Sequence, residues 1–168
     1  NAVLLVCLVV SVVKLATVLG NYANSRKLYR EASEQAVYTP EPAVTAFEQT
    51  ADDAVSDTPA LPQETPPILV DFDRIREEGK HVRGWLYCAG TVIDYPVVAY
   101  SNNEYFLTHD YTGAHNDAGA LFFDSRNTTE LTGDQLIIYG HHMKDKSMFG
   151  SLLEYQKQEY YDQHPTLY

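Results

Sequence analysis

The stretch from residue 135 to 150, QLIIYGHHMKDKSMFG, holds the residues of this chain best suited to proton transfer. An apolar run, predicted to be a strand, ends in Tyr139 and Gly140, and His141 and His142 follow. A histidine held at a strand end can act as a general acid or base near neutral pH. Side chains alternate along a strand, so only His141 would share a face with Tyr139. A surface histidine pair without a catalytic role is the alternative from spacing alone.

Other residues that could do chemistry do not gather around a second centre in the sequence. A metal site would need both histidines together with His115 or Asp117. Adjacent histidines on a strand point to opposite faces, and no metal-ligand spacing recurs. We therefore expect neither a metal nor another cofactor. Four further groups are expected to be solvated loop residues: His109, Asp110, Asp117 and Asp124.

Composition excludes several classes of protein. The chain has 168 residues, with 12 Lys and Arg against 23 Asp and Glu, for a formal net charge of −11. Phosphate binding needs clustered basic charge, so we expect no nucleic-acid partner. Two cysteines are too few for a disulfide-rich scaffold or a four-cysteine zinc module. The charge is uneven: residues 1–30 sum to +4, 31–67 to −8 and 68–168 to −7, which indicates three regions.

Residues 1–20 are predicted to be a transmembrane anchor. The segment 2–19 is almost entirely apolar, and at ~1.5 Å per residue it would span roughly 27 Å of a hydrocarbon core ~30 Å thick. Lys14 lies toward one end, where its long side chain can reach the headgroups. A cleaved signal peptide and a soluble core helix are the alternatives. Three basic residues between positions 26 and 30 would favour a cytoplasmic location for the remainder of the chain.

Residues 21–67 are predicted to be a polar, acidic, proline-rich linker or stalk. The first part, 21–37, is compatible with a helix but mostly polar, and 38–67 holds six of the eight prolines. This composition buries too little apolar surface to offset the entropy of ordering, so we expect an extended spacer. A docking site for a partner is the alternative.

Residues 68–168 are predicted to be the start of a mainly β domain. A short helix over 70–79 is expected to stop at Gly79. Short strands joined by turns come next, which is typical of a closed or partly closed β-barrel. Pro96 should place its strand at a sheet edge or in a bulge. The strands are expected at 84–88, 92–100, 121–124 and 135–139, with a loop over 127–133 and helical spacing over 147–161.

Three blocks of this third region carry a resemblance: 84–98 (GWLYCAGTVIDYPVV), 103–127 (NEYFLTHDYTGAHNDAGALFFDSRN) and 138–152 (IYGHHMKDKSMFGSL). In order and content they resemble the class B sortases, which are membrane-anchored cysteine transpeptidases of Gram-positive bacteria. The resemblance covers about 68–168 and implies a sortase-type β-barrel with short helices. The chain opens at Asn1 and stops before the family's catalytic strand, so we expect a fragment with an incomplete barrel.

The resemblance implies a two-step reaction through a covalent intermediate. A cysteine thiolate would attack a threonine carbonyl in the sorting signal of an exported surface protein. An amine from a peptidoglycan precursor or a pilin would then resolve the acyl-enzyme. His141 matches the catalytic histidine, which moves protons, and an arginine would stabilise the oxyanion. The family's cysteine strand and arginine do not occur in these 168 residues, and neither Cys7 nor Cys88 matches the nucleophile.

Asn103, Leu107 and Tyr139 match positions that line the substrate groove in some class B members, although Leu107 could instead be a core residue. Lys146 stands where the family usually has glycine, so the turn must avoid or tolerate a positive φ. The implied partners are a sorting-signal peptide, the acceptor amine and the membrane. We expect a single-pass protein of the cell membrane with its catalytic domain outside. The competing hypotheses are a sortase-like domain that only binds and a membrane-tethered metal hydrolase.

Overall fold

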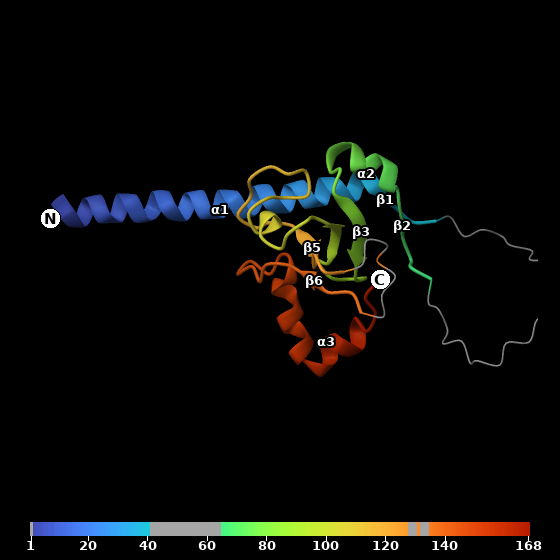
Figure 1. The fold of residues 1–168 in the computed structure, drawn as a ribbon. Coiled ribbons are helices and arrows are strands. Elements are labelled where there is room, and N and C mark those ends of the chain that lie inside the picture. Colours follow the sequence, from blue (N-terminus) through green and yellow to red (C-terminus); the bar gives the residue numbers. More distant parts are fainter. Residues whose placement is uncertain (1, 41–64, 128–130, 132–134) are drawn as a thin grey trace, which may run out of the picture.

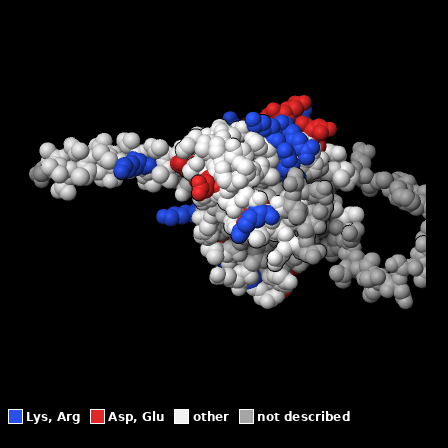
Figure 2. Space-filling model, in the orientation of Figure 1, with Lys and Arg blue, Asp and Glu red and all other residues white. Residues whose placement is uncertain are grey.

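A single long helix dominates the outline of the molecule. The computed structural model describes residues 2–40, 65–127, 131 and 135–168, and in it α1 (Ala2–Ala36) runs unbroken for 35 residues. The apolar first half of α1 stands clear of the other elements, and the second half lies along them (Figure 1). The surface of the protruding half is almost free of charge (Figure 2). By length and composition this helix is able to cross a membrane.

The second half of α1 belongs to the folded core. Four residues on one face of it are buried: Ser25, Tyr29, Ala32 and Ala36. Their spacing of three or four residues is that of one helix face. The prediction of a linker at 21–67 is therefore wrong for residues 21–36, which form a packed helix. One face that carries small residues and a tyrosine is enough to pack a helix whose other faces are polar. Most of the remaining linker, 41–64, lies outside the described residues.

The strands of the main sheet follow the order β3-β4-β5-β6. β3 (Val82–Tyr87) and β4 (Asp94–Val98) are antiparallel, β5 (Leu121–Phe123) is parallel to β4, and β6 (Ile138–Tyr139) is antiparallel to β5. The sheet is open in the described part of the chain, because no strand there joins β3 to β6. The mainly β fold is confirmed, whereas these residues by themselves do not close a barrel.

β4 shows how a proline can occupy an inner strand. The sequence predicts an edge or a bulge at Pro96, but β4 lies between β3 and β5. Pro96 pairs with Trp85 of β3, and pairing with β5 begins only at Val97. The missing N–H of the proline therefore interrupts no bond to β5. The prediction of an edge strand is wrong, and the irregularity lies in β3, where the register shifts between Val82 and Gly84.

Short elements complete the fold. α2 (Phe72–Glu78) begins after Asp71, whose carboxylate accepts a hydrogen bond from Arg74 N at 2.9 Å, and it ends at Gly79 as predicted. The helical spacing over 147–161 is confirmed only in part, because Lys157 is extended and divides the stretch. The remaining elements are β1 (Val37–Tyr38) paired with β2 (Leu69–Val70), η1 (Tyr105–Leu107), η2 (Phe149–Gln156) and α3 (Gln158–Gln163).

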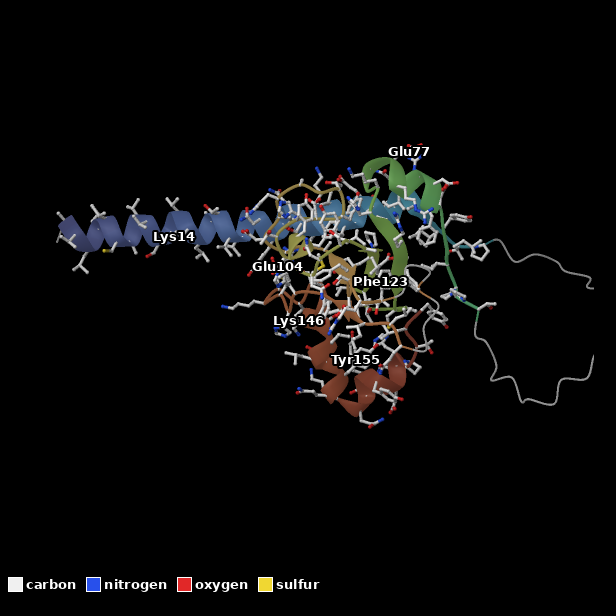
Figure 3. All side chains as sticks on the ribbon, in the orientation of Figure 1. Lys14, Glu77, Glu104, Phe123, Lys146 and Tyr155 are labelled. Carbon is white, nitrogen blue, oxygen red and sulfur yellow. The ribbon has the colours of Figure 1, made fainter. Side chains whose placement is uncertain are left out.

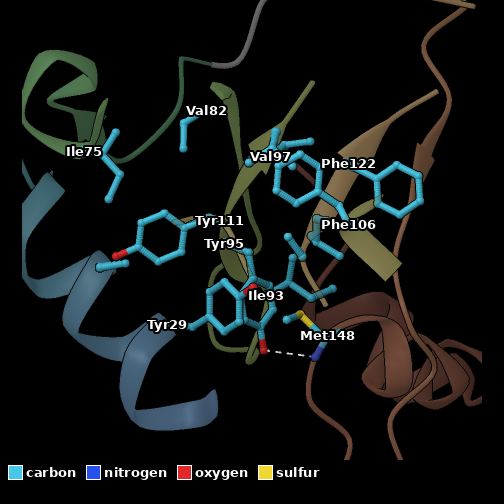
Figure 4. Packing of buried hydrophobic residues seen from close by; sticks show 14 of the residues in the cluster. Tyr29, Ile75, Val82, Ile93, Tyr95, Val97, Phe106, Tyr111, Phe122 and Met148 are labelled. Atoms are coloured by element: carbon cyan, nitrogen blue, oxygen red, sulfur yellow. Dashed lines mark hydrogen bonds between the residues drawn. The ribbon is translucent and has the colours of Figure 1, made fainter. Parts of the chain in front are cut away.

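The hydrophobic core joins α1, the sheet and the loop after β6 (Figure 4). Tyr29 of α1 meets Tyr95 of β4 edge to face, with ring centroids 5.4 Å apart. The Tyr95 hydroxyl accepts a hydrogen bond from the backbone N–H of Met148 at 3.1 Å. One continuous set of buried contacts thus connects the long helix to the loop that carries the histidine pair.

Candidate active site

His141 lies two residues beyond the end of β6, where the loop toward η2 begins. Its Nε2 atom is 2.7 Å from the backbone carbonyl oxygen of Leu107. A carbonyl can only accept, so Nε2 carries the proton, and Nδ1 keeps a lone pair in the neutral ring. The His141 carbonyl in turn accepts a hydrogen bond from Phe149 N at 3.0 Å. The half-buried imidazole is therefore held in one orientation and can take up a proton at Nδ1.

His141 and His142 differ in how firmly their side chains are held. β6 ends at Tyr139, so regular strand alternation does not continue through the pair. His142 is exposed, and its backbone forms an isolated bridge with Met148. The chain can pass close to β5 just before the pair because Gly140 has no side chain: a Cβ there would collide with Leu121 and the Phe149 ring.

The turn after the histidines contains two residues with left-handed backbone. Lys146 has φ +65° and Met148 has φ +49°, and a positive φ of this kind costs a non-glycine residue on the order of 1–3 kcal/mol. The turn thus tolerates the positive φ expected at Lys146. The Lys146 ammonium lies 2.5 Å from Glu154 and, together with Lys157, lowers the pKa of that carboxyl to about 2. These contacts, and the bond from Met148 to Tyr95, hold the strained turn in place.

Tyr139 belongs to a polar cluster built on a buried carboxylate. Its hydroxyl donates to Asp124 Oδ2 at 2.8 Å. The Arg126 guanidinium donates to both carboxylate oxygens, from Nε at 2.9 Å and from Nη2 at 2.7 Å. The Asp124 side chain is fully buried, while 77% of the Arg126 side chain is exposed. The guanidinium, the Arg126 backbone N–H and the Tyr139 hydroxyl hold the pKa of Asp124 well below its usual range.

The other two predicted groove residues lie next to these groups. Leu107 supplies the carbonyl that fixes His141, and its side chain is 38% exposed. Asn103 Oδ1 accepts a hydrogen bond from Ser125 N at 2.7 Å, beside Asp124. The structure therefore connects Leu107 directly to His141, and Asn103 and Tyr139 to the Asp124 cluster. Whether these residues bind a substrate remains a prediction.

Two of the four groups expected to be solvated have structural roles instead. Asp124 is buried in the polar cluster, and Asp110 is buried where it closes a turn by accepting from Thr112 and Ala114. The expectation of solvated side chains is wrong for both, because each carboxylate is satisfied by several donors. Sequence reasoning missed Arg126, although an aspartate and an arginine two residues apart after an apolar strand could have indicated a local ion pair.

The two cysteines have surroundings unlike those of a nucleophile. Cys7 is exposed on the apolar half of α1. Cys88 is buried, and its Sγ lies 3.2 Å from the hydroxyl of Tyr155. The Tyr155 hydroxyl donates its proton to the carbonyl of His164 at 2.8 Å, which connects η2 to the segment after α3.

Two curated proteins with sequences similar to this chain are both named sortase B. Sortase B of Listeria monocytogenes serovar 1/2a is 41% identical over 92 residues, which is 55% of this chain and 37% of that protein. Sortase B of Staphylococcus aureus is 34% identical over 100 residues, 60% of this chain and 41% of that protein. The chain thus spans about two fifths of the length of these relatives. No family model matches the chain.

Solved structures with a similar fold are also structures of sortase B. The chain superposes on Bacillus anthracis sortase B in complex with AAEK1 with a TM-score of 0.67 and 28% identity, covering 89% of this chain and 62% of that one. The Staphylococcus aureus sortase B–substrate complex gives a TM-score of 0.54 and 33% identity, covering 57% and 44%. The fold of this chain is thus similar to that of the solved sortase B structures. Among these proteins the chain is similar in sequence and in fold to sortases of class B, as its resemblance implied.

Proposed function

We propose that the full protein is a cysteine transpeptidase that cleaves a sorting signal in exported surface proteins and transfers the acyl group to an amine. The observation that supports this most directly is the His141 imidazole, fixed by Leu107 at the end of β6. The proposal requires a cysteine and an arginine from outside these 168 residues, which cover only part of the curated relatives.

In the proposed reaction the thiolate attacks the carbonyl carbon of a threonine, and the peptide C–N bond breaks as His141 gives a proton to the leaving amine. A thioester remains. The acceptor amine then attacks the thioester, His141 takes its proton, and the thiolate leaves. The arginine stabilises the oxyanion in both steps. Sortase B has been crystallised with a substrate, in the Staphylococcus aureus protein, and with triglycine, which supports a peptide donor and an amine acceptor for this protein too.

The proposed substrate groove runs past Asn103, Leu107 and Tyr139. Leu107 offers an exposed apolar side chain close to His141. Tyr139 is 36% exposed, while its hydroxyl is held by Asp124. A partly exposed side chain that is fixed at its hydroxyl can pack against a peptide without losing side-chain freedom on binding.

We place the protein in the cell membrane, with α1 as its single span and the domain outside, because the proposed substrates are exported. The acceptor is proposed to be a peptidoglycan precursor or a pilin amine. A sortase-like domain that binds such peptides without catalysis is the second candidate function, because both described cysteines are unlike nucleophiles.

The test uses the full-length protein with fluorogenic peptides that share a central threonine and with triglycine as the acceptor. We expect a product in which the N-terminal part of a peptide is joined to triglycine, detected by mass spectrometry. His141→Ala should remove this product. A wild-type protein that binds the peptides but forms neither a thioester nor a transfer product would support the binding domain and contradict the enzyme.

A further inference from the structure

The guanidinium of Arg126 is held by a buried partner but faces solvent. The Asp124 side chain that accepts its hydrogen bonds is fully buried, while 77% of the Arg126 side chain is exposed. The negative charge of this ion pair therefore lies beneath the surface, and the positive charge lies at it. In Figure 3, Phe123, which precedes Asp124 in the chain, lies among the side chains of the folded domain and away from Lys14 on the protruding half of α1.

The bonds to Asp124 use only one edge of the guanidinium. Nε donates to Oδ1 at 2.9 Å and Nη2 donates to Oδ2 at 2.7 Å. A guanidinium carries five N–H donors in a planar fork, so both N–H groups of Nη1 and the second N–H of Nη2 point away from Asp124. Two parallel N–H groups on Nη1 and Nη2 match the two oxygens of a carboxylate. The exposed edge of Arg126 can therefore bind a second carboxylate while the first stays bound.

The backbone on both sides of Arg126 is held in place. Ser125 N donates to Asn103 Oδ1 at 2.7 Å. Asn127 exchanges two hydrogen bonds with Ile137: its Nδ2 donates to the carbonyl at 2.9 Å, and its Oδ1 accepts from the backbone N–H at 3.3 Å. With its backbone and one edge of its side chain fixed, Arg126 would lose less conformational entropy on binding a ligand than a mobile surface arginine.

Arg126 lies beside the proposed substrate groove. Its Nη2 and the Tyr139 hydroxyl donate to the same oxygen, Asp124 Oδ2, at 2.7 and 2.8 Å. Tyr139 precedes His141 by two residues, which separates their Cα atoms by at most about 7 Å. An extended peptide advances by ~3.3 Å per residue. A peptide whose threonine lies at His141 would therefore bring a residue two or three positions away close to Arg126.

We propose that Arg126 determines specificity by binding a carboxylate of a bound peptide through its exposed edge. The inference rests on the proposed function, because it assigns a ligand to the same groove. An acidic side chain two or three residues from the threonine of the acyl donor would supply the carboxylate, and the C-terminal carboxylate of the acceptor has the same chemistry. Asp124 then acts as a positioning residue, because its buried charge fixes the direction of the guanidinium.

The first test compares peptides that differ only in charge. Donor peptides with a central threonine carry Glu or the isosteric Gln at each neighbouring position, and triglycine or triglycine amide is the acceptor. Binding to the full-length protein is measured by fluorescence anisotropy, and kcat/KM by mass spectrometry of the products. We expect one acidic position, or the acceptor carboxylate, to improve Kd and kcat/KM by roughly three- to tenfold. The preference should shrink in about 1 M salt.

The second test separates recognition from the pairing with Asp124. In Arg126→Lys, an ammonium can still neutralise the buried carboxylate but offers no second edge, so the preference should fall to about one. The ratio compares two peptides on one protein, so a general loss of stability cancels. Arg83→Lys is the matched control and should keep the preference, because Arg83 is exposed on β3, at the opposite end of the strand order from β6.

Each outcome of these tests decides the inference. A wild-type ratio near one for every donor position and for the acceptor would overturn it, and so would a preference that persists in Arg126→Lys. Failure of the wild type to bind any of the peptides would overturn both this inference and the proposed function. Charge-dependent binding without turnover would support the role of Arg126 and contradict only the proposed enzyme.

Discussion

The Nε2 atom of His141 and the backbone carbonyl oxygen of Leu107 lie 2.7 Å apart, across 34 positions of the sequence. Because the acceptor is a backbone atom, the bond does not depend on the side chain at position 107. It fixes the tautomer that leaves Nδ1 free to exchange a proton. The same residue offers its exposed side chain to the proposed groove, so the orientation of the imidazole and the shape of the groove are determined together.

The histidine pair gives the first prediction. In the full-length protein, His141→Ala should lower transpeptidation by at least ~10²–10⁴-fold, the usual contribution of a general acid–base group. His142→Ala should retain much of the activity, because His142 is exposed and only its backbone makes the bridge to Met148. Steady-state kinetics with a peptide and triglycine would measure both. Equal losses, or a greater loss at His142, would overturn the assignment.

The buried carboxylate gives a prediction for pH. The folded state holds the pKa of Asp124 far below its unfolded value, which is about 3.9. The charged form therefore stabilises the fold above pH ~4, and this contribution is lost progressively as the pH falls below that value. In urea unfolding, Asp124→Asn should be less stable than the wild type at pH 7, and the difference should shrink by pH 3. A difference independent of pH would mean that shape rather than charge matters at this position.

The left-handed turn gives a matched pair of variants. Both Lys146→Gly and Lys146→Ala lose the ion pair with Glu154, but only glycine adopts φ +65° without strain. The glycine variant should therefore be more stable than the alanine variant by about 1–2 kcal/mol. Thermal or urea unfolding of the two proteins would measure the gap. The opposite order would show that the turn adopts another conformation in solution.

The packing of α1 gives a prediction about domain boundaries. Tyr29→Ala should destabilise the domain by about 3–5 kcal/mol, because it empties a buried aromatic site. Gln35 on the same helix is exposed, so Gln35→Ala should have almost no effect on stability.

Because α1 covers part of the core, residues 68–168 expressed alone should be aggregation-prone and inactive, and adding residues 21–40 should improve their solubility. A soluble 68–168 monomer with cooperative unfolding would contradict this view of α1.

The predicted topology can be tested in cells. Protease added to intact protoplasts should cleave the chain within 38–67, where the proline-rich sequence disfavours a packed core. Cleavage only after lysis would place the domain in the cytoplasm, as the basic residues after the apolar segment would favour.

Local sequence patterns were sufficient for several features of this protein. The apolar run at 2–19, the helix that stops at Gly79 and the short strands all arise from periodicity and turn residues, which are properties of neighbouring positions. The resemblance of three sequence blocks to class B sortases also predicted the proteins to which the chain is similar and its mainly β fold. His141 could be selected as a candidate for the same reason, since Tyr-Gly-His is a continuous motif.

Only the tertiary structure revealed the roles that depend on distant partners. The polar stretch at 21–36 has no apolar pattern strong enough to predict burial, yet Tyr29 and Ala32 become core residues because the sheet presents a surface that fits them. Asp124 looks like a loop acid in the sequence, and it is buried because Arg126 and Tyr139 satisfy both of its oxygens. The imidazole of His141 is fixed by a carbonyl 34 residues away. Such contacts form only when the chain folds, because no spacing within one element brings these atoms together.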